Sequence, residues 1–282
     1  MSPIVSVYFK EEDYSGVDYI VKRSFKIILA SSLILSLLFV IWPQSLLMLF
    51  SVKNPADIPV VLDAVRIFSI SYVGTGIVFF YTFYSQALEK NKISTLISLL
   101  EGLIIPVIAA LVFSQIWGGV GIWISVVITE VITIAFIFAY SKYINRKTDG
   151  EFSGFFSNKH NDDKNVFEYT IEGDVSQAVD LSSNVQDYLA GNKSATLVSL
   201  AIEEMLVNII NINESVDAID VIVRNNDNYI LISIKDTGVD FNPVVENDNL
   251  KLDNISVLNK IADKIDYSRV LGLNSTVITI KN

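Results

Sequence analysis

Long apolar segments with few charged residues fill the first half of the chain and are separated by short polar or glycine-containing turns. They cover residues 27–52, 67–88, 93–114 and 120–141. The third and fourth segments each contain one acid, Glu101 and Glu130, and Pro106 interrupts the third. A helix needs about 20 apolar residues to cross a bilayer. Four such segments in succession favour membrane spans over buried helices of a soluble protein, so we predict an all-α four-helix membrane segment in residues 1–147.

The pattern changes after residue 147. Residues 148–165 are polar apart from Phe152, Phe155 and Phe156, and we expect a tether whose aromatic rings rest at the membrane interface. Residues 166–282 alternate between strand and helix patterns. Predicted strands cover residues 166–171, 218–224, 229–235, 267–271 and 276–280, and predicted helices cover 174–189, 254–265 and a segment beginning at 194 or 195. This order predicts an α/β sandwich, with helices on one face of a mixed sheet.

Charge divides the chain at the same place. Residues 1–147 hold 11 Lys and Arg against 9 Asp and Glu, whereas residues 148–282 hold 10 against 22. The acidic second part argues against nucleic-acid binding. The chain has no cysteine, so disulfides are excluded.

Basic residues predict the orientation of the spans. They gather before the first span, between the second and third, and after the fourth, as Lys10, Lys22, Arg23, Lys26, Lys90, Lys92, Lys142, Arg146 and Lys147. Cytoplasmic loops carry such residues preferentially. We therefore predict a multi-pass protein of the cell membrane with both termini in the cytoplasm.

Residues 200–210, LAIEEMLVNII, have the apolar spacing of a helix, with Leu200, Ile202, Leu206, Ile209 and Ile210 as the stripe. Glu204 and Asn208 are four residues apart, so they lie on one helix face. Such a pair can be an ordinary solvated face. It can also serve a magnesium–nucleotide site, with the carboxylate as base and the amide oxygen as a metal ligand.

Two later segments favour the nucleotide interpretation. The Ile-rich strand 229–235 ends in Asp236, which could accept the exocyclic amine of adenine, and Gly238, which would let backbone approach the ring. Residues 272–276, GLNST, lead into the last strand and end in Thr276.

In this order and spacing the segments resemble the GHKL ATPase fold, and within it the anti-sigma-factor serine kinases. The resemblance covers residues 166–282. It implies that Glu204 polarises an attacking hydroxyl, that Asn208 holds Mg²⁺, and that Asp236, Gly238 and Thr276 bind the adenine of ATP. The implied protein substrate is an antagonist of the anti-sigma type.

The second part departs from that family in its glycines. Asp240 stands where a second glycine is usual, and residues 252–254 contain none. The acids Asp240, Glu246, Asp248 and Asp253 face only one base, Lys251, in this stretch. These departures predict weak nucleotide affinity, or a degenerate domain that only binds a protein.

The first part resembles the last four helices of a MATE-family antiporter. The resemblance rests on residues 2–6, 43–50, 66–68, 84–88 and 119–123 together with Glu130. A MATE transporter has two six-helix bundles, so this chain corresponds to part of one. We expect it either to be a fragment of a transporter or to assemble with a second copy or a separate transporter half.

Glu101 and Glu130 are costly inside a bilayer. They are either cation- or proton-coupling carboxylates or protonated packing residues. The sequence thus leaves three functions open: a membrane-anchored regulatory ATPase or serine kinase, a drug or cation antiporter with a regulatory domain, and a degenerate scaffold.

Overall fold

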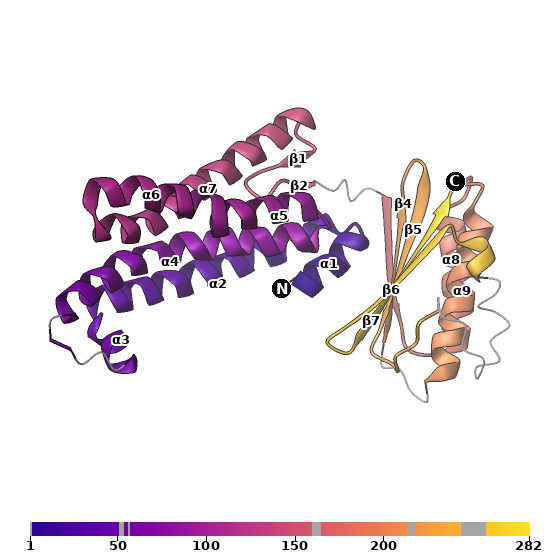
Figure 1. The fold of residues 1–282 in the computed structure, drawn as a ribbon. Helices are drawn as coiled ribbons and strands as arrows, with labels where there is room; N and C mark the ends of the chain where they lie inside the picture. The colour runs from indigo at the N-terminus through magenta and orange to yellow at the C-terminus, as the bar shows by residue number, and fades with distance from the viewer. Residues whose placement is uncertain (1, 51–53, 56, 160–164, 214–217, 244–257) are drawn as a thin grey trace. The chain divides into compact units, whose positions relative to one another are not determined.

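The computed structural model describes residues 2–50, 54–55, 57–159, 165–213, 218–243 and 258–282 (Figure 1). The chain divides into two compact units. The first unit comprises residues 1–9 and 13–160, and the second comprises residues 10–12 and 161–282.

Helices make up most of the first unit. In chain order they are α1 (Ser2–Lys10), α2 (Tyr14–Ile41), α3 (Gln44–Leu49), α4 (Ile58–Ala87), α5 (Asn91–Leu99), α6 (Ile105–Trp117) and α7 (Gly119–Lys147). Helix α4 packs against both α2 and α7, and α6 packs against α7. Gly121 permits the last contact, because a Cβ there would overlap the backbone of Phe113.

Five described helical segments are long and apolar enough to cross a membrane: α2, α4, the segment from α5 to α6, α7 and α9 of the second unit. Half of the most apolar part of α9 is buried inside the structure, whereas the other four segments leave most of theirs exposed. Soluble proteins rarely expose so much contiguous apolar surface. The four segments of the first unit therefore have the surface expected of contact with a lipid bilayer.

The predicted spans 67–88 and 120–141 lie within or nearly within α4 and α7, whereas the first and third spans differ from the observed helices. Residues 27–52 do not form a single helix as the predicted span requires, because α2 ends at Ile41 and α3 begins after Pro43. Proline disfavours helical backbone in the residue before it, which explains a break at Trp42. Helix α4 begins well before residue 67, so it includes the Asp63–Arg66 ion pair.

The predicted third span contains a local distortion. Residues Leu100–Ile104 form a π-helical turn between α5 and α6, and the Ile105 N–H donates to the Leu100 carbonyl. Pro106 lacks an N–H and would clash with the carbonyl four residues earlier in a regular helix. The wider turn removes that conflict, and it places Glu101 on the irregular segment.

The expected tether is partly folded. Strands β1 (Phe152–Ser153) and β2 (Asn158–Lys159) form a short antiparallel hairpin. Phe155 and Phe156 at its tip pack against aromatic rings of α2, α4 and α7, at centroid distances of 4.7–6.4 Å. The aromatic cluster therefore belongs to the helical unit.

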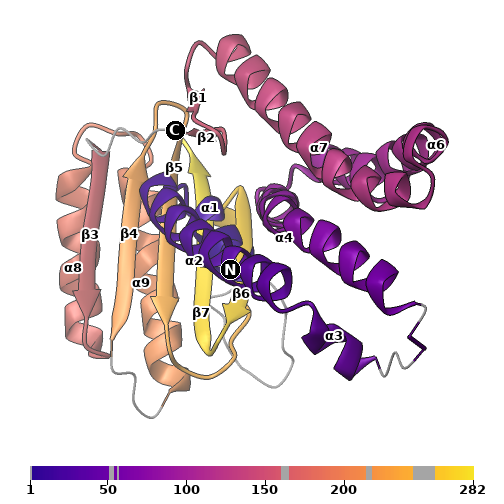
Figure 2. The same ribbon diagram turned by 90° about the vertical axis from the view of Figure 1, so that its left-hand side faces the viewer.

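A five-stranded sheet forms the second unit, in the order β3-β4-β5-β7-β6 (Figure 2). The strands are β3 (Val166–Ile171), β4 (Ile219–Asn225), β5 (Tyr229–Asp236), β6 (Lys264–Val270) and β7 (Leu273–Lys281). Every neighbouring pair is antiparallel, so the expectation of a mixed sheet is wrong. Two of the four pairs, β4–β5 and β6–β7, are hairpins, in which a short turn reverses the chain direction.

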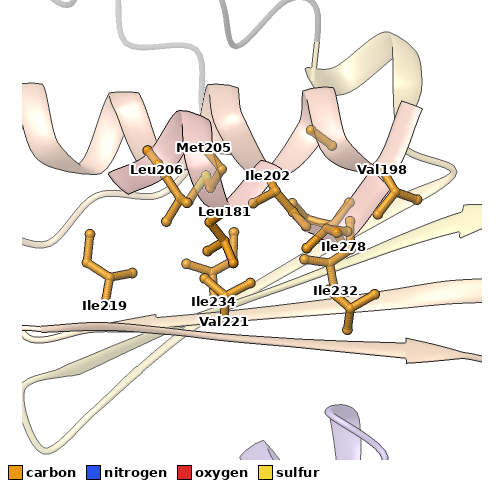
Figure 3. Packing of buried hydrophobic residues seen from close by; sticks show 14 of the residues in the cluster. Leu181, Val198, Ile202, Met205, Leu206, Ile219, Val221, Ile232, Ile234 and Ile278 are labelled. Carbon is orange, nitrogen blue, oxygen red and sulfur yellow. The ribbon is translucent and has the colours of Figure 1, made fainter. Parts of the chain in front are cut away.

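Helices α8 (Val175–Tyr188) and α9 (Ala195–Ile212) cover one face of this sheet (Figures 1 and 2). Asp174 caps α8 as predicted, by accepting from the Ser176 N–H at 2.9 Å. Apolar side chains of both helices meet alternate side chains of the strands, as Figure 3 shows. Burial of the predicted apolar stripe of α9 is confirmed for Ile202, Leu206 and Ile209, whereas Leu200 is exposed.

The predicted third helix is too long at its end. Residues 258–261 are helical, whereas β6 begins at Lys264, inside the range 254–265 predicted to be helical. Leu258 is buried in the core. The start of this predicted helix lies outside the described residues.

Replacing Ile232 with alanine should lower the free energy of unfolding by about 2–5 kcal/mol, because this fully buried side chain lies in the core between sheet and helices. Chemical denaturation of the full chain in detergent, monitored by circular dichroism, would measure the change. Leu271→Ala is the control, since Leu271 is exposed. Equal stabilities of the two variants would contradict this packing.

Candidate functional site at the polar end of the sandwich

The helix-covered face of the sheet changes from apolar to polar toward one end. Side chains alternate between the two faces of a strand, so Asp236 lies on the same face as the core residue Ile234. Asp236 is directly opposite Asn274 of β7, and Ile234 is opposite Thr276. The apolar layer therefore ends in an acid, an amide and a hydroxyl.

Asp236 is buried and only half paired. Its Oδ1 accepts the Gly238 N–H at 2.8 Å and Asn274 Nδ2 at 2.8 Å. Among the described residues, no donor reaches Oδ2. Two donors use the lone pairs of one oxygen, so the second oxygen is the acceptor available to a ligand.

Asn274 joins this acid to two side chains of β6. Its Nδ2 also donates to the Val239 carbonyl at 2.8 Å. Its Oδ1 accepts from Arg269 Nη1 at 2.7 Å and lies 2.8 Å from the Tyr267 hydroxyl, whose single hydrogen can go either to this oxygen or to Asp240. Both Nδ2 hydrogens are donated and Oδ1 accepts from a donor-only guanidinium, which fixes the orientation of the amide.

Gly238 has a packing role that differs from the predicted one. A Cβ at this position would overlap the amide of Asn213, the residue that ends α9. The same amide accepts the Val239 N–H at 2.8 Å and donates to the Ile209 carbonyl at 2.7 Å. Glycine is thus required because the loop after β5 passes close to the end of α9.

Glu204 and Asn208 lie on α9, as predicted. Asn208 is 1% exposed, and its Nδ2 has no partner among the described residues. Glu204 is partly exposed. A buried amide without a partner is costly, so Asn208 is a second polar group under α9 that a ligand could satisfy.

The structure brings the predicted site residues together only in part. Asp236 and Gly238 are hydrogen bonded, and Thr276 is two residues from the partner of Asp236 on β7. No hydrogen bond among the described residues joins Glu204 or Asn208 to Asp236.

Several residues of the site were missed by sequence reasoning, namely Asn213, Tyr267, Arg269 and Asn274. Asn274 is part of the segment that drew attention to Thr276, but only the strand register reveals that it faces Asp236. Asp240 is exposed and accepts the Tyr267 hydroxyl at 2.5 Å. The other loop residues singled out, Glu246, Asp248, Lys251, Asp253 and residues 252–254, lie outside the described part of the chain.

The helical unit contains a second half-paired acid. Glu130 on α7 is 5% exposed, and its Oε1 accepts from the Thr75 hydroxyl of α4 at 2.7 Å. Its Oε2 has no partner among the described residues. Gly74 makes room for this side chain, since a Cβ there would collide with Glu130. Glu101 is less buried than Glu130.

Comparisons with known proteins do not assign the chain to a family. The chain matches no protein-family model and no curated protein.

Tyr267 provides a titration test of the site. Desolvation by burial, and then the hydrogen bond and charge of Asp240, raise its pKa to about 12, while Arg269 opposes the shift. The phenol should therefore remain neutral well above pH 10, the ordinary pKa of tyrosine. Absorbance of the phenolate in wild type minus Tyr267→Phe should show this late titration, and Asp240→Asn should lower its midpoint. A difference curve centred near pH 10 would contradict the geometry.

Proposed function

We propose that the chain is a membrane-anchored regulatory protein that binds Mg²⁺–ATP at the polar end of its second unit. The observation that carries the proposal is the buried carboxylate of Asp236 with one oxygen lacking a donor among the described residues. A ligand N–H group, such as the exocyclic amine of adenine, would satisfy that oxygen. The four membrane-like helices would hold this site at a membrane surface.

The resemblance to GHKL ATPases agrees with this placement. Helices α8 and α9 cover one face of the sheet, and the polar residues lie on that face. Thr276 is buried beside the Asp236–Asn274 pair and would help to bind the base. The acid at Asp240 leads us to expect weak affinity, because it adds negative charge near a triphosphate.

Asn208 and Glu204 fit a magnesium–nucleotide site. No group of three His, Cys, Asp or Glu side chains is gathered for a metal among the described residues. Mg²⁺ needs no such cage, since it is often held by one or two protein oxygens together with phosphate oxygens and waters. The Asn208 amide oxygen would supply the protein ligand, and the bound ion would neutralise phosphate charge.

The proposed function includes transfer of the γ-phosphate of ATP to a serine of a protein partner. Glu204, one turn from Asn208 and partly exposed, would accept the proton of a serine hydroxyl on an antagonist-type protein partner. The serine oxygen would then bond to the γ-phosphorus as the bond to the β-phosphate oxygen breaks and ADP leaves.

Asp236→Asn should weaken ATP binding by about tenfold to a hundredfold, because a charged hydrogen-bond acceptor is replaced by an amide. Calorimetry of the full chain in lipid nanodiscs, with ATP and Mg²⁺, would measure this. Asp227→Asn removes the same charge from an exposed position and should bind as wild type does. Asn208→Ala should remove the dependence of binding on Mg²⁺.

Absence of binding heat at millimolar ATP in the wild-type chain would contradict the proposed function. Equal affinities of the two aspartate variants would contradict the assignment of Asp236.

A second candidate function, transport of a drug or cation, is favoured by Glu130. Intramembrane acids are rare and usually functional, and this one has only Oε1 paired among the described residues. A proton or cation could occupy the other oxygen. A transporter would be completed by a second copy of the chain or by a separate half.

Glu130→Gln should abolish proton-driven efflux of a lipophilic cationic dye from inverted vesicles that contain the chain, because the amide cannot exchange a proton. Glu89→Gln, which changes an exposed acid after α4, should leave efflux unchanged. Efflux that persists in Glu130→Gln, or that is absent in wild type, would contradict the transport candidate.

A further inference from the structure

We infer that Arg269 is a positioning residue that sets base selectivity through Asn274 and Asp236. The inference rests on the proposed nucleotide site and identifies the side chain that determines which base it accepts.

The orientation of the Asn274 amide decides what Asp236 can bind. With Nδ2 toward Asp236, the amide donates to Oδ1 and leaves Oδ2 as an acceptor. If the amide turned over, its oxygen would face the carboxylate, and two acceptors would repel each other. Asp236 would then have to shift, and the free acceptor would lose its fixed direction.

Two protein groups besides Asp236 oppose this reversal: the Val239 carbonyl, which can only accept and takes the other Nδ2 hydrogen at 2.8 Å, and Arg269. A guanidinium can only donate, and Arg269 Nη1 donates to Asn274 Oδ1 at 2.7 Å. The Tyr267 hydroxyl lies 2.8 Å from the same oxygen, but it has one hydrogen, which Asp240 Oδ1 also approaches at 2.5 Å. A hydroxyl can also accept, so Tyr267 would tolerate either amide orientation. Arg269 Nη1 also donates to the Gly238 carbonyl at 3.0 Å, which ties the loop after Asp236 to β6.

An acceptor held in a fixed direction distinguishes ATP from inosine triphosphate (ITP). The two nucleotides differ on the base, where adenine has an amine and hypoxanthine has a keto oxygen. The amine can donate to Asp236 Oδ2, whereas the keto oxygen would face it as a second acceptor. We expect the wild-type chain to prefer ATP by about tenfold or more.

The test compares dissociation constants for Mg²⁺–ATP and Mg²⁺–ITP in full-length variants in nanodiscs. Arg269→Met should reduce the ITP-to-ATP ratio of dissociation constants at least about threefold, because the donor-only constraint on the amide is lost. Arg269→Lys keeps a donor-only group and should restore most of the ratio. Tyr267→Phe should leave the ratio close to that of wild type.

Lys264→Met is the matched control, since it removes one positive charge from an exposed position on the same strand. It should leave both dissociation constants unchanged. Arg269 is itself exposed, so its replacement leaves the core intact, and circular dichroism would verify folding.

Different results overturn different parts of the account. If wild type prefers ATP and Arg269→Met keeps that preference, the base is selected without Arg269. Loss of preference in Tyr267→Phe but not in Arg269→Met would assign the role to the hydroxyl instead. If wild type binds neither nucleotide, the proposed function fails and this inference fails with it.

Discussion

A carboxylate buried next to an apolar layer must find donors, and Asp236 imposes this constraint on the second unit. The core between sheet and helices is built from isoleucine, leucine and valine, and it ends where Asp236 and Asn274 face each other across β5 and β7. Two hydrogen bonds to one oxygen keep the acid in place. The remaining oxygen is the acceptor on which the proposed nucleotide site depends.

Helix α9 contributes side chains both to the apolar core and to the polar end of the second unit. Ile202, Leu206 and Ile209 complete the core, while Asn208 on the same helix is buried with an amide donor unpaired among the described residues. Its last turn is tied to the loop after β5 through Asn213. The helical unit also contains a buried acid of this kind. One oxygen of Glu130 is hydrogen bonded to Thr75, and the other has no donor among the described residues. Among the described residues, both units thus contain a buried acid with one oxygen that accepts no hydrogen bond.

The sequence was sufficient for features that depend on local pattern. It predicted the apolar helices, the Asp174 cap, α9 and the β4–β5 hairpin, because periodicity and capping are encoded within a few neighbouring residues. It failed where distant segments decide the outcome. The antiparallel order of all five strands, the folded Phe155–Phe156 hairpin and the contact of Gly238 with Asn213 depend on tertiary pairing. Arg269 and Asn274 were missed for the same reason, since only the register of β6 and β7 places them beside Asp236.

The central claim is that Asp236 offers a fixed acceptor to the base of a nucleotide. A structure of the full chain, determined by electron cryo-microscopy with Mg²⁺ and a non-hydrolysable ATP analogue, would test it most directly. The account predicts the exocyclic amine of adenine within hydrogen-bond distance of Asp236 Oδ2, with the phosphates toward Asn208 on α9. A nucleotide bound elsewhere on the chain, or an Asp236 Oδ2 bonded only to protein side chains, would contradict it.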